Sequence, residues 1–275
     1  MDTTRTMPLL GATITLTLYD TDPRVAEGIF KQAYQEGLRL QSIFNLYDQK
    51  SELSRLNEKR SAIMSEEFLT VLKVALDYGA QTQGAYDVSR GKQYLARKYK
   101  QQLPAIQCSY KDIHISGNHV KLTHPDVSID LNSIAKGFIG DRLVEFLISL
   151  GVASGFVDVR GDLRIFGNHL EVVDIKHPRT SGAIATLILE KNAVATSGDY
   201  LQYDTAFERS HILGARNASA TIVAPTLMEA DALATCAMVL SPEQFKELTA
   251  HPSLLISTAG TCTRLHNFEA LEYGN

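Results

Sequence analysis

The stretch GFVDVRGDLRIFGNHLEVVDI (155–175) decides the fold class. Apolar, strand-forming segments in it are separated by short turns rich in glycine and asparagine. Further segments of the same kind follow at 184–197 and 218–224. Strands that follow one another as hairpins, with helices set between groups of strands, are typical of antiparallel sheets. The stretch therefore predicts an α+β fold with mainly antiparallel sheets and flanking helices.

The rest of the chain fits this prediction. Residues 12–20 alternate apolar and polar side chains, as a half-buried strand does. Asp22 and Pro23 are a helix cap and a first-turn proline ahead of apolar residues at helical spacing. We expect helices over 22–44, from Ser65, over 133–150 and from Pro242. We also expect a hairpin over 112–122 and strands at 127–131, 254–258 and 261–267. The least structured stretch is expected at 95–111.

Composition limits the function classes. The chain has 275 residues, of which 44% are hydrophobic, which is enough for one large domain or two small ones. No linker or break in composition divides it, and we expect a single domain over 1–275. Its formal charge of -4 gives no reason to expect a nucleic-acid partner. The three cysteines lie far apart, so neither a disulfide framework nor a zinc site is expected. No apolar run is long enough to span a bilayer and no leader precedes the first strand, which predicts a cytoplasmic protein unless a leader was trimmed.

The segment MEADALAT (228–235) carries the first candidate site. Asp231 and Thr235 are four positions apart and so project from one face of an alanine-rich helix. Thr226 and Glu229 form a capping-box pattern, which gives Glu229 a structural role. Asp231 is then either a solvated first-turn residue or, with the Thr235 hydroxyl, an oxygen ligand of Mg²⁺. The helix pattern alone leaves both interpretations open.

Three other segments are candidates for ligand binding. DLNSIAKGFIGDRL (130–143) leads into a helix start whose free N–H groups, with Lys136, suit a phosphate, although a capped helix with an exposed lysine has the same pattern. AVATSGDYLQYD (193–204) has small residues that let the backbone approach a ligand, or is a simple turn. His211 in SHILGARN is either structural or a proton shuttle.

Taken in order, these segments resemble the ApbE-like family of flavin transferases. The resemblance rests on LGATITLTLYD (10–20), FNLYDQKSELSRLN (44–57), GAYDVSRG (84–91), DLNSIAKGF (130–138), VDIKHP (173–178), VATSGDY (194–200) and ADALAT (230–235). Each motif is weak alone, but their common order over nearly the whole chain is hard to produce by chance.

The resemblance implies a two-lobed fold with FAD in a cleft and Mg²⁺ near its diphosphate. The implied reaction transfers FMN from FAD to a threonine hydroxyl of an acceptor flavoprotein and releases AMP. The metal ligands would be Asp231, Thr235 and the carbonyl of Ala135. Asp231 or His211 would be the base, with Lys136 beside the phosphates. Residues implied to bind FAD are Tyr47, Glu52, Tyr86, Asp87, Lys136, Arg160, Gly161, Asp162, Ser197 and Gly198.

Two segments depart from the family pattern. A Gly-Gly-Asn/Asp motif becomes RGD at 160–162, which adds a guanidinium suited to phosphate or to the adenine region. The motif His-x-Ile-Asp-Pro-x-Thr-Gly becomes HILGARNA at 211–218, which alters a loop expected to meet the acceptor. These departures keep open an FAD pyrophosphatase, which would use water as acceptor, and a non-catalytic FAD-binding protein. The sequence does not name the acceptor, the number of metal ions or the oligomeric state.

Overall fold

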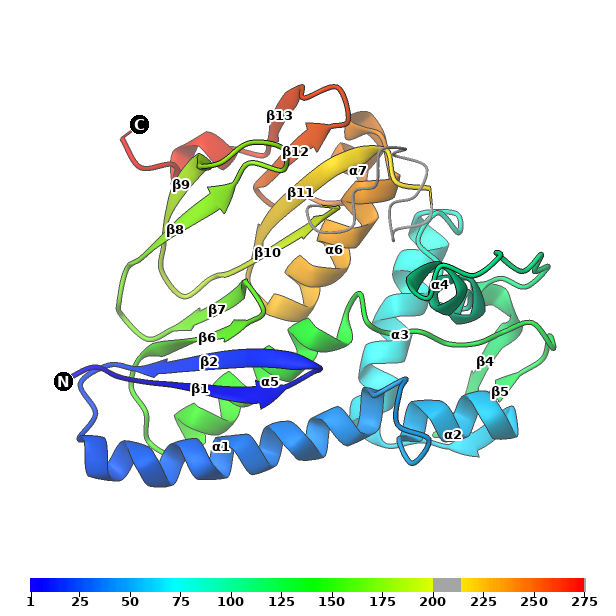
Figure 1. Cartoon of the computed structure of the whole chain (residues 1–275), viewed down its shortest axis with the longest axis horizontal. Coiled ribbons are helices and arrows are strands. Elements are labelled where there is room, and N and C mark those ends of the chain that lie inside the picture. The colour runs from blue at the N-terminus through cyan, green and yellow to red at the C-terminus, as the bar shows by residue number, and fades with distance from the viewer. Residues whose placement is uncertain (200–213, 275) are drawn as a thin grey trace.

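A computed structural model describes residues 1–199 and 214–274. It confirms the α+β fold: a lobe built on a large antiparallel sheet lies beside a smaller lobe of helices and a short sheet (Figure 1). Helix α1 runs beneath both lobes in this view and joins them.

The large sheet forms the frame of the first lobe. Within the described residues it has eight strands, and each neighbouring pair is antiparallel. Strand β6 shows why its sequence forms a strand, since alternate residues are buried and the others are partly exposed. In spatial order the strands are β1 (Thr3–Leu9), β2 (Ala12–Leu18), β6 (Gly155–Val159), β7 (Asp162–Phe166), β10 (Ala193–Gly198), β11 (Asn217–Ala224), β12 (Ser253–Ser257) and β13 (Cys262–Leu265).

Two smaller sheets complete the strand content of the described residues. One is the predicted hairpin over 112–122, which pairs with a third short strand in the second lobe. The other is a two-stranded ribbon over the large sheet. Their strands are β3 (Ser61–Ile63), β5 (His119–Leu122) and β4 (Ile113–Ser116), then β8 (Glu171–Lys176) and β9 (Ala183–Leu189).

The helices begin where capping residues precede apolar periodicity. Asp22 accepts a hydrogen bond from the backbone N–H of Arg24 at 2.8 Å, and Pro23 is the first residue of α1, as predicted. Ser65 caps α3 in the same way by accepting from the N–H of Phe68. The helices are α1 (Pro23–Phe44), α2 (Glu52–Lys59), α3 (Glu66–Gln81), α4 (Gly91–Lys98), α5 (Ala135–Ser149), α6 (Leu227–Val239) and α7 (Pro242–Leu248).

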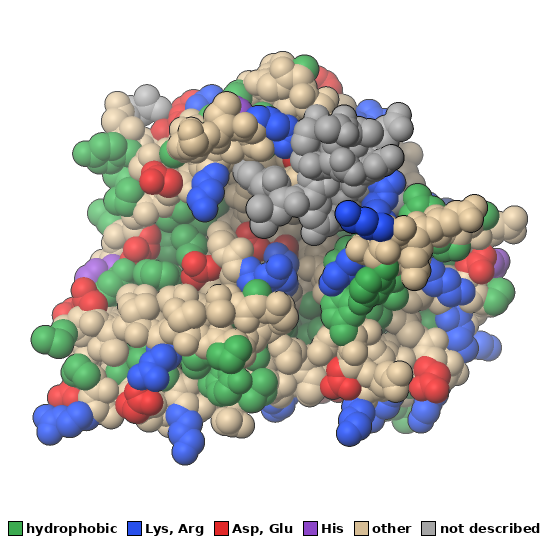
Figure 2. Space-filling view, in the orientation of Figure 1, with side chains coloured by type: hydrophobic (Ala, Val, Ile, Leu, Met, Phe, Trp, Pro, Cys, Tyr) green, Lys and Arg blue, Asp and Glu red, His purple; other side chains and the backbone are tan. Residues whose placement is uncertain are grey.

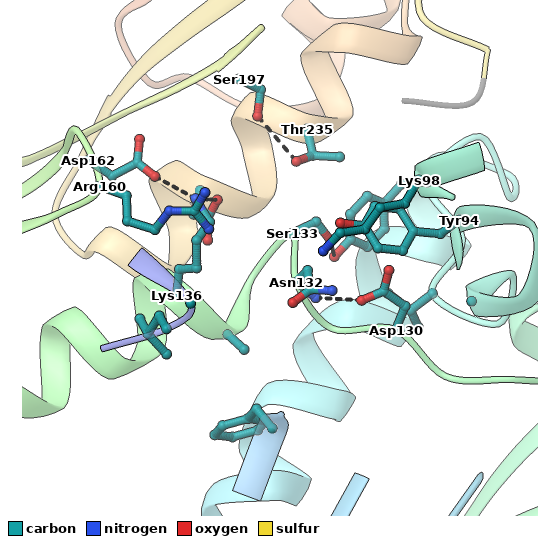
Figure 3. A pocket seen from close by; sticks show the side chains of 18 of the residues that line it. Tyr94, Lys98, Asp130, Asn132, Ser133, Lys136, Arg160, Asp162, Ser197 and Thr235 are labelled. Carbon is teal, nitrogen blue, oxygen red and sulfur yellow. Dashed lines mark hydrogen bonds and ion pairs between the residues drawn. The ribbon is translucent and has the colours of Figure 1, made fainter. Parts of the chain in front are cut away.

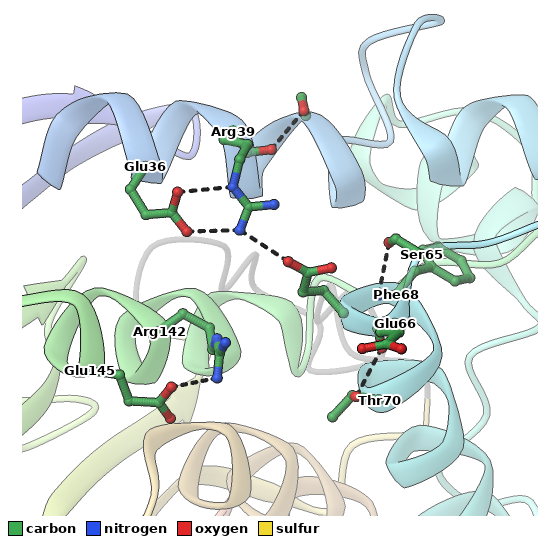
Figure 4. Close-up of polar contacts among 10 residues, drawn as sticks. Glu36, Arg39, Ser65, Glu66, Phe68, Thr70, Arg142 and Glu145 are labelled. Atoms are coloured by element: carbon green, nitrogen blue, oxygen red, sulfur yellow. Dashed lines mark hydrogen bonds and ion pairs between the residues drawn. The ribbon is translucent and has the colours of Figure 1, made fainter. Parts of the chain in front are cut away.

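Packing and surface ion pairs connect the lobes. One large core cluster contains buried residues from the first strands, α1, α3, α5 and α6, so it extends through both lobes. On the surface, Arg39 of α1 pairs with Glu36 at 2.7 Å and with Glu67 of α3 at 3.0 Å (Figure 4). Such exposed pairs contribute little stability, so the shared core is what holds the lobes together.

The structure corrects two predictions of local structure. The stretch 127–131 is extended but is no strand of a sheet; Ser128 and Asp130 donate backbone hydrogen bonds to Ser89 and Val88, both at 2.9 Å. Its period-two burial arises because Val127, Ile129 and Leu131 belong to the large hydrophobic core cluster. The stretch 95–111 is also not wholly irregular, because α4 covers its start and a short 3-10 helix (Tyr110–Asp112) covers its end.

No helix among the described residues combines the length and the apolarity that crossing a bilayer requires.

Candidate active site

A cavity of about 750 Å³ is lined by residues of both lobes. Its walls come from the end of α1, the segment before α4, α4 itself, the start of α5, the β6–β7 turn, β10 and α6. The volume is in the range of a site for a sizeable small molecule. In Figure 2 the hollow between the lobes has Lys and Arg side chains on both sides.

A buried charge cluster occupies the end of the cavity on the large-sheet side (Figure 3). Lys136 Nζ lies 2.7 Å from Asp162 Oδ2 and 3.3 Å from Asp231 Oδ1. Both carboxylates are almost fully buried, with side-chain exposures of 7% and 4%. Asp231 is thus not a solvated first-turn residue.

Two helices bring this cluster together by direct backbone contact. Asp231 Oδ2 on α6 accepts a hydrogen bond from the N–H of Gly137 on α5 at 3.1 Å. A Cβ atom at position 137 would lie 2.3 Å from the carbonyl oxygen of Leu227, so only glycine permits this approach. The carboxylate is therefore held at the start of α5, next to Ala135.

A second carboxylate fixes the start of α6. Asp141 of α5 accepts hydrogen bonds from the backbone N–H groups of Leu227 and Met228, both at 2.8 Å. Arg164 of β7 pairs with the same side chain at 3.1 Å. Because the first N–H groups of a helix have no partner within it, Asp141 acts as a cap supplied by a neighbouring helix.

The predicted metal ligands meet at the cavity. Ala135, Asp231 and Thr235 all line it, and the Thr235 hydroxyl lies 3.3 Å from that of Ser197 on β10. The described residues contain no cluster of three or more His, Cys, Asp or Glu side chains that would hold a metal. The candidate set is instead a carboxylate, a hydroxyl and a main-chain carbonyl, all oxygen donors of the kind that Mg²⁺ takes. The donor chemistry fits a magnesium ion.

The protonation equilibria of the cluster are shifted by burial and by mutual attraction. Burial raises the pKa of Asp231 to about 6, although the Lys136 ammonium acts in the opposite direction. For Lys136, burial would lower the pKa, but Asp231 and Asp162 together raise it above its usual range. Lys136 therefore stays charged and is committed to the two carboxylates.

Aromatic and polar groups line the opposite wall. Tyr86 is buried and its hydroxyl lies 2.9 Å from that of Ser133. Tyr47 is 47% exposed, with Lys98 Nζ 4.0 Å from its ring centroid. Burial raises the pKa of Asp130, also in this wall, to about 6. This wall offers ring surfaces, whereas the charge cluster offers carboxylate oxygens for a cation.

Most predicted FAD-binding residues line the cavity. Glu52 instead accepts a hydrogen bond from the N–H of Ser65 at 3.0 Å, Gly161 lies in the β6–β7 turn, and Gly198 pairs with Ser219. His211 lies outside the described residues. The predicted residues that the structure brings to the cavity are Tyr47, Tyr86, Asp87, Lys136, Arg160, Asp162 and Ser197.

The sequence predictions missed many lining residues, among them Asp130, Tyr94 and Lys98, and one side-chain pairing. Asp130 stands in the quoted segment 130–143 but was not selected, and Tyr94 and Lys98 lie next to or in the stretch 95–111, which was expected to be the least structured. The aromatic and basic residues at 94–98 were the available signal. Glu229 donates its N–H to the Thr226 hydroxyl at 3.3 Å, but its side chain pairs with His251 at 2.9 Å, so half of the predicted capping box is replaced.

The sequence is similar to proteins of one family. The model of the ApbE family matches residues 10–256. The FAD:protein FMN transferase of Vibrio cholerae is 28% identical over 271 residues, which span 86% of this chain and 81% of the relative. That of Haemophilus influenzae is 30% identical over 252 residues, which span 76% of this chain and 72% of the relative.

Solved structures show the same fold. The flavin transferase ApbE from Vibrio cholerae superposes with a TM-score of 0.84 at 22% identity, covering 98% of this chain and 99% of its own. The ApbE protein from Thermotoga maritima superposes with a TM-score of 0.85 at 23% identity, covering 99% of each chain. With the matched motifs and the cavity they line, these similarities show that the chain belongs to the ApbE family.

Proposed function

We propose that this protein transfers FMN from FAD to a threonine hydroxyl of an acceptor flavoprotein and releases AMP, in a reaction that depends on Mg²⁺. The observation that carries the proposal is that Asp231, Thr235 and Ala135 line the same cavity as Lys136 and Asp162, with Lys136 bonded to both Asp162 and Asp231. The names of the relatives from Vibrio cholerae and Haemophilus influenzae support the flavin-transfer reaction. The cytoplasmic location stays a prediction from the sequence.

Each residue of the cluster has a distinct role in this proposal. Asp231, Thr235 and the carbonyl of Ala135 would hold the magnesium ion. When bound, the ion would neutralise the diphosphate and stabilise the phosphate that leaves with AMP. Lys136 keeps the two buried carboxylates close together, because its ammonium bonds to both. Asp162 is held in place by accepting the backbone N–H of Thr196 at 3.0 Å.

The transfer itself needs a proton acceptor. The threonine oxygen attacks the phosphorus of the FMN half, that P–O bond forms, and the bond to the AMP oxygen breaks. The hydroxyl proton must pass to a base, because an alcohol is hardly ionised at neutral pH. Within the described residues Asp231 is the candidate, and the prediction for His211 stays untested.

The test is incubation with FAD, Mg²⁺ and an acceptor domain that the Vibrio cholerae relative modifies. We expect the acceptor to gain the mass of one FMN on threonine, with AMP as the second product. Release of FMN and AMP without protein modification would make the protein a pyrophosphatase instead. FAD that is bound but unchanged would make it a binding protein.

A further inference from the structure

The β6–β7 turn has an unusual residue at a position that favours glycine. Val159 and Asp162 are paired across the hairpin, which leaves Arg160 and Gly161 as its two-residue loop. Their φ angles are 63° and 97°, both in the left-handed region. Turns with two such residues favour Asn or Gly, because an L side chain is strained there. Arg160 therefore occupies its position at some cost to stability.

The Arg160 side chain is directed at the cavity. It lines the cavity and extends from the turn toward Lys136 and Asp162 (Figure 3). Within the described residues its guanidinium forms no hydrogen bond and no ion pair. Arg160 is exposed, so its guanidinium is hydrated and available to a ligand. The strained backbone that places this free cation at the cavity points to a role in binding.

The other basic residues of the cavity already have partners. Lys136 bonds to Asp162 and Asp231, so this group of three carries a net negative charge when both carboxylates are ionised. Lys98 donates to the Tyr47 hydroxyl, and Arg90 Nε lies 3.5 Å from Asp87. A diphosphate that enters this end of the cavity therefore meets excess negative charge unless a further cation is present.

We infer that Arg160 binds the diphosphate of FAD and lets FAD bind before any metal ion, while Lys136 serves as the counter-ion of the carboxylates. This inference rests on the proposed function, because it takes FAD as the ligand. A guanidinium presents several N–H donors in one plane and suits two phosphate oxygens at once. It narrows the sequence prediction of a phosphate or adenine contact to the diphosphate, and it transfers the phosphate-binding role from Lys136 to Arg160.

The test separates ligand binding from stability. FAD and riboflavin, which lacks phosphate, are titrated by flavin fluorescence in EDTA against the wild type, Arg160→Gly and Arg160→Lys. We expect Arg160→Gly to bind FAD about tenfold or more weakly and riboflavin with unchanged affinity. Arg160→Lys keeps the charge but loses the two-oxygen contact, so its FAD affinity should lie between those of Arg160→Gly and wild type. The urea midpoint of Arg160→Gly should rise, because glycine relieves the strained turn.

A matched control comes from another turn. Lys191, between β9 and β10, is also left-handed, with φ of 56°, and does not line the cavity formed by the described residues. Lys191→Gly should raise the urea midpoint and leave FAD binding unchanged. Equal FAD affinity of Arg160→Gly and wild type in EDTA would overturn the inference. So would an equal loss for riboflavin, or a wild type that binds FAD only with Mg²⁺. Failure of FMN transfer, by contrast, would show only in the acceptor assay.

Discussion

The buried carboxyl group of Asp130, in the wall of the cavity, destabilises the folded protein when it is ionised. Burial raises its pKa from 3.8 to about 6, while hydrogen bonds from Asn132 and the charge of Lys98 lower it. Between these two pKa values the folded protein holds a proton that the unfolded chain has lost. The stability that this proton gives is complete below the unfolded pKa and is lost as the pH rises through the folded pKa.

This shift gives a pH-dependent prediction for Asp130→Asn. Asparagine can still accept the backbone N–H of Asn132, which Asp130 accepts at 2.9 Å, but it never ionises. The free energy of unfolding of the variant, minus that of the wild type, should increase by roughly 2 to 3 kcal/mol as the pH rises from about 4 to about 7.5. Urea unfolding of both proteins at the two pH values measures this difference. A pH-independent difference would show that Asp130 has an ordinary pKa.

At the scale of elements, the contact between α5 and α6 positions the site. Asp141 caps α6 by accepting the backbone N–H groups of Leu227 and Met228, and Asp231 accepts the N–H of Gly137 in return. These hydrogen bonds connect the two helices at both ends of their contact. The register of Asp231 relative to Ala135 thus depends on a residue outside the cavity lining formed by the described residues.

Asp141→Ala should therefore lower both the stability of the protein and its affinity for Mg²⁺. It leaves two buried N–H groups and Arg164 without this carboxylate, so we expect a loss of about 3 kcal/mol. The Mg²⁺ concentration that half-saturates FMN transfer should rise about tenfold or more. Glu145→Ala on the same helix removes only an exposed pair with Arg142 (Figure 4) and should change neither quantity measurably. An unchanged magnesium requirement in Asp141→Ala would contradict this positioning role.

Local sequence signals predicted elements better than they predicted contacts between elements. The caps at Asp22 and Ser65 and the alternation around β6 act within a few residues, so α1, α3 and the hairpins could be predicted. The pairing of Asp231 and Thr235 on one face follows from helix geometry in the same way. The bond between Lys136 and Asp162 joins residues 26 positions apart, and the Glu229–His251 pair depends on where β12 begins. Neither contact leaves a local pattern in the sequence.

At the scale of the whole molecule, the cavity depends on both lobes staying together. The large core cluster includes Leu16 of the first lobe and Phe68 of the second, both fully buried. The single domain over 1–275 stays a prediction. Urea unfolding followed by far-UV circular dichroism and by tyrosine fluorescence should give coincident transitions. Two separate transitions would mean that the lobes fold independently.

The central claim is that the charge cluster of this chain transfers FMN to protein. Its most direct test is intact-mass analysis of the acceptor domain after incubation with FAD and Mg²⁺, using the wild type and Asp231→Asn. The wild type should add one FMN to a threonine. The variant should be slower by about a hundredfold or more, because it loses the charged metal ligand and base candidate. An unmodified acceptor with the wild type, or equal rates for the two proteins, would contradict the account.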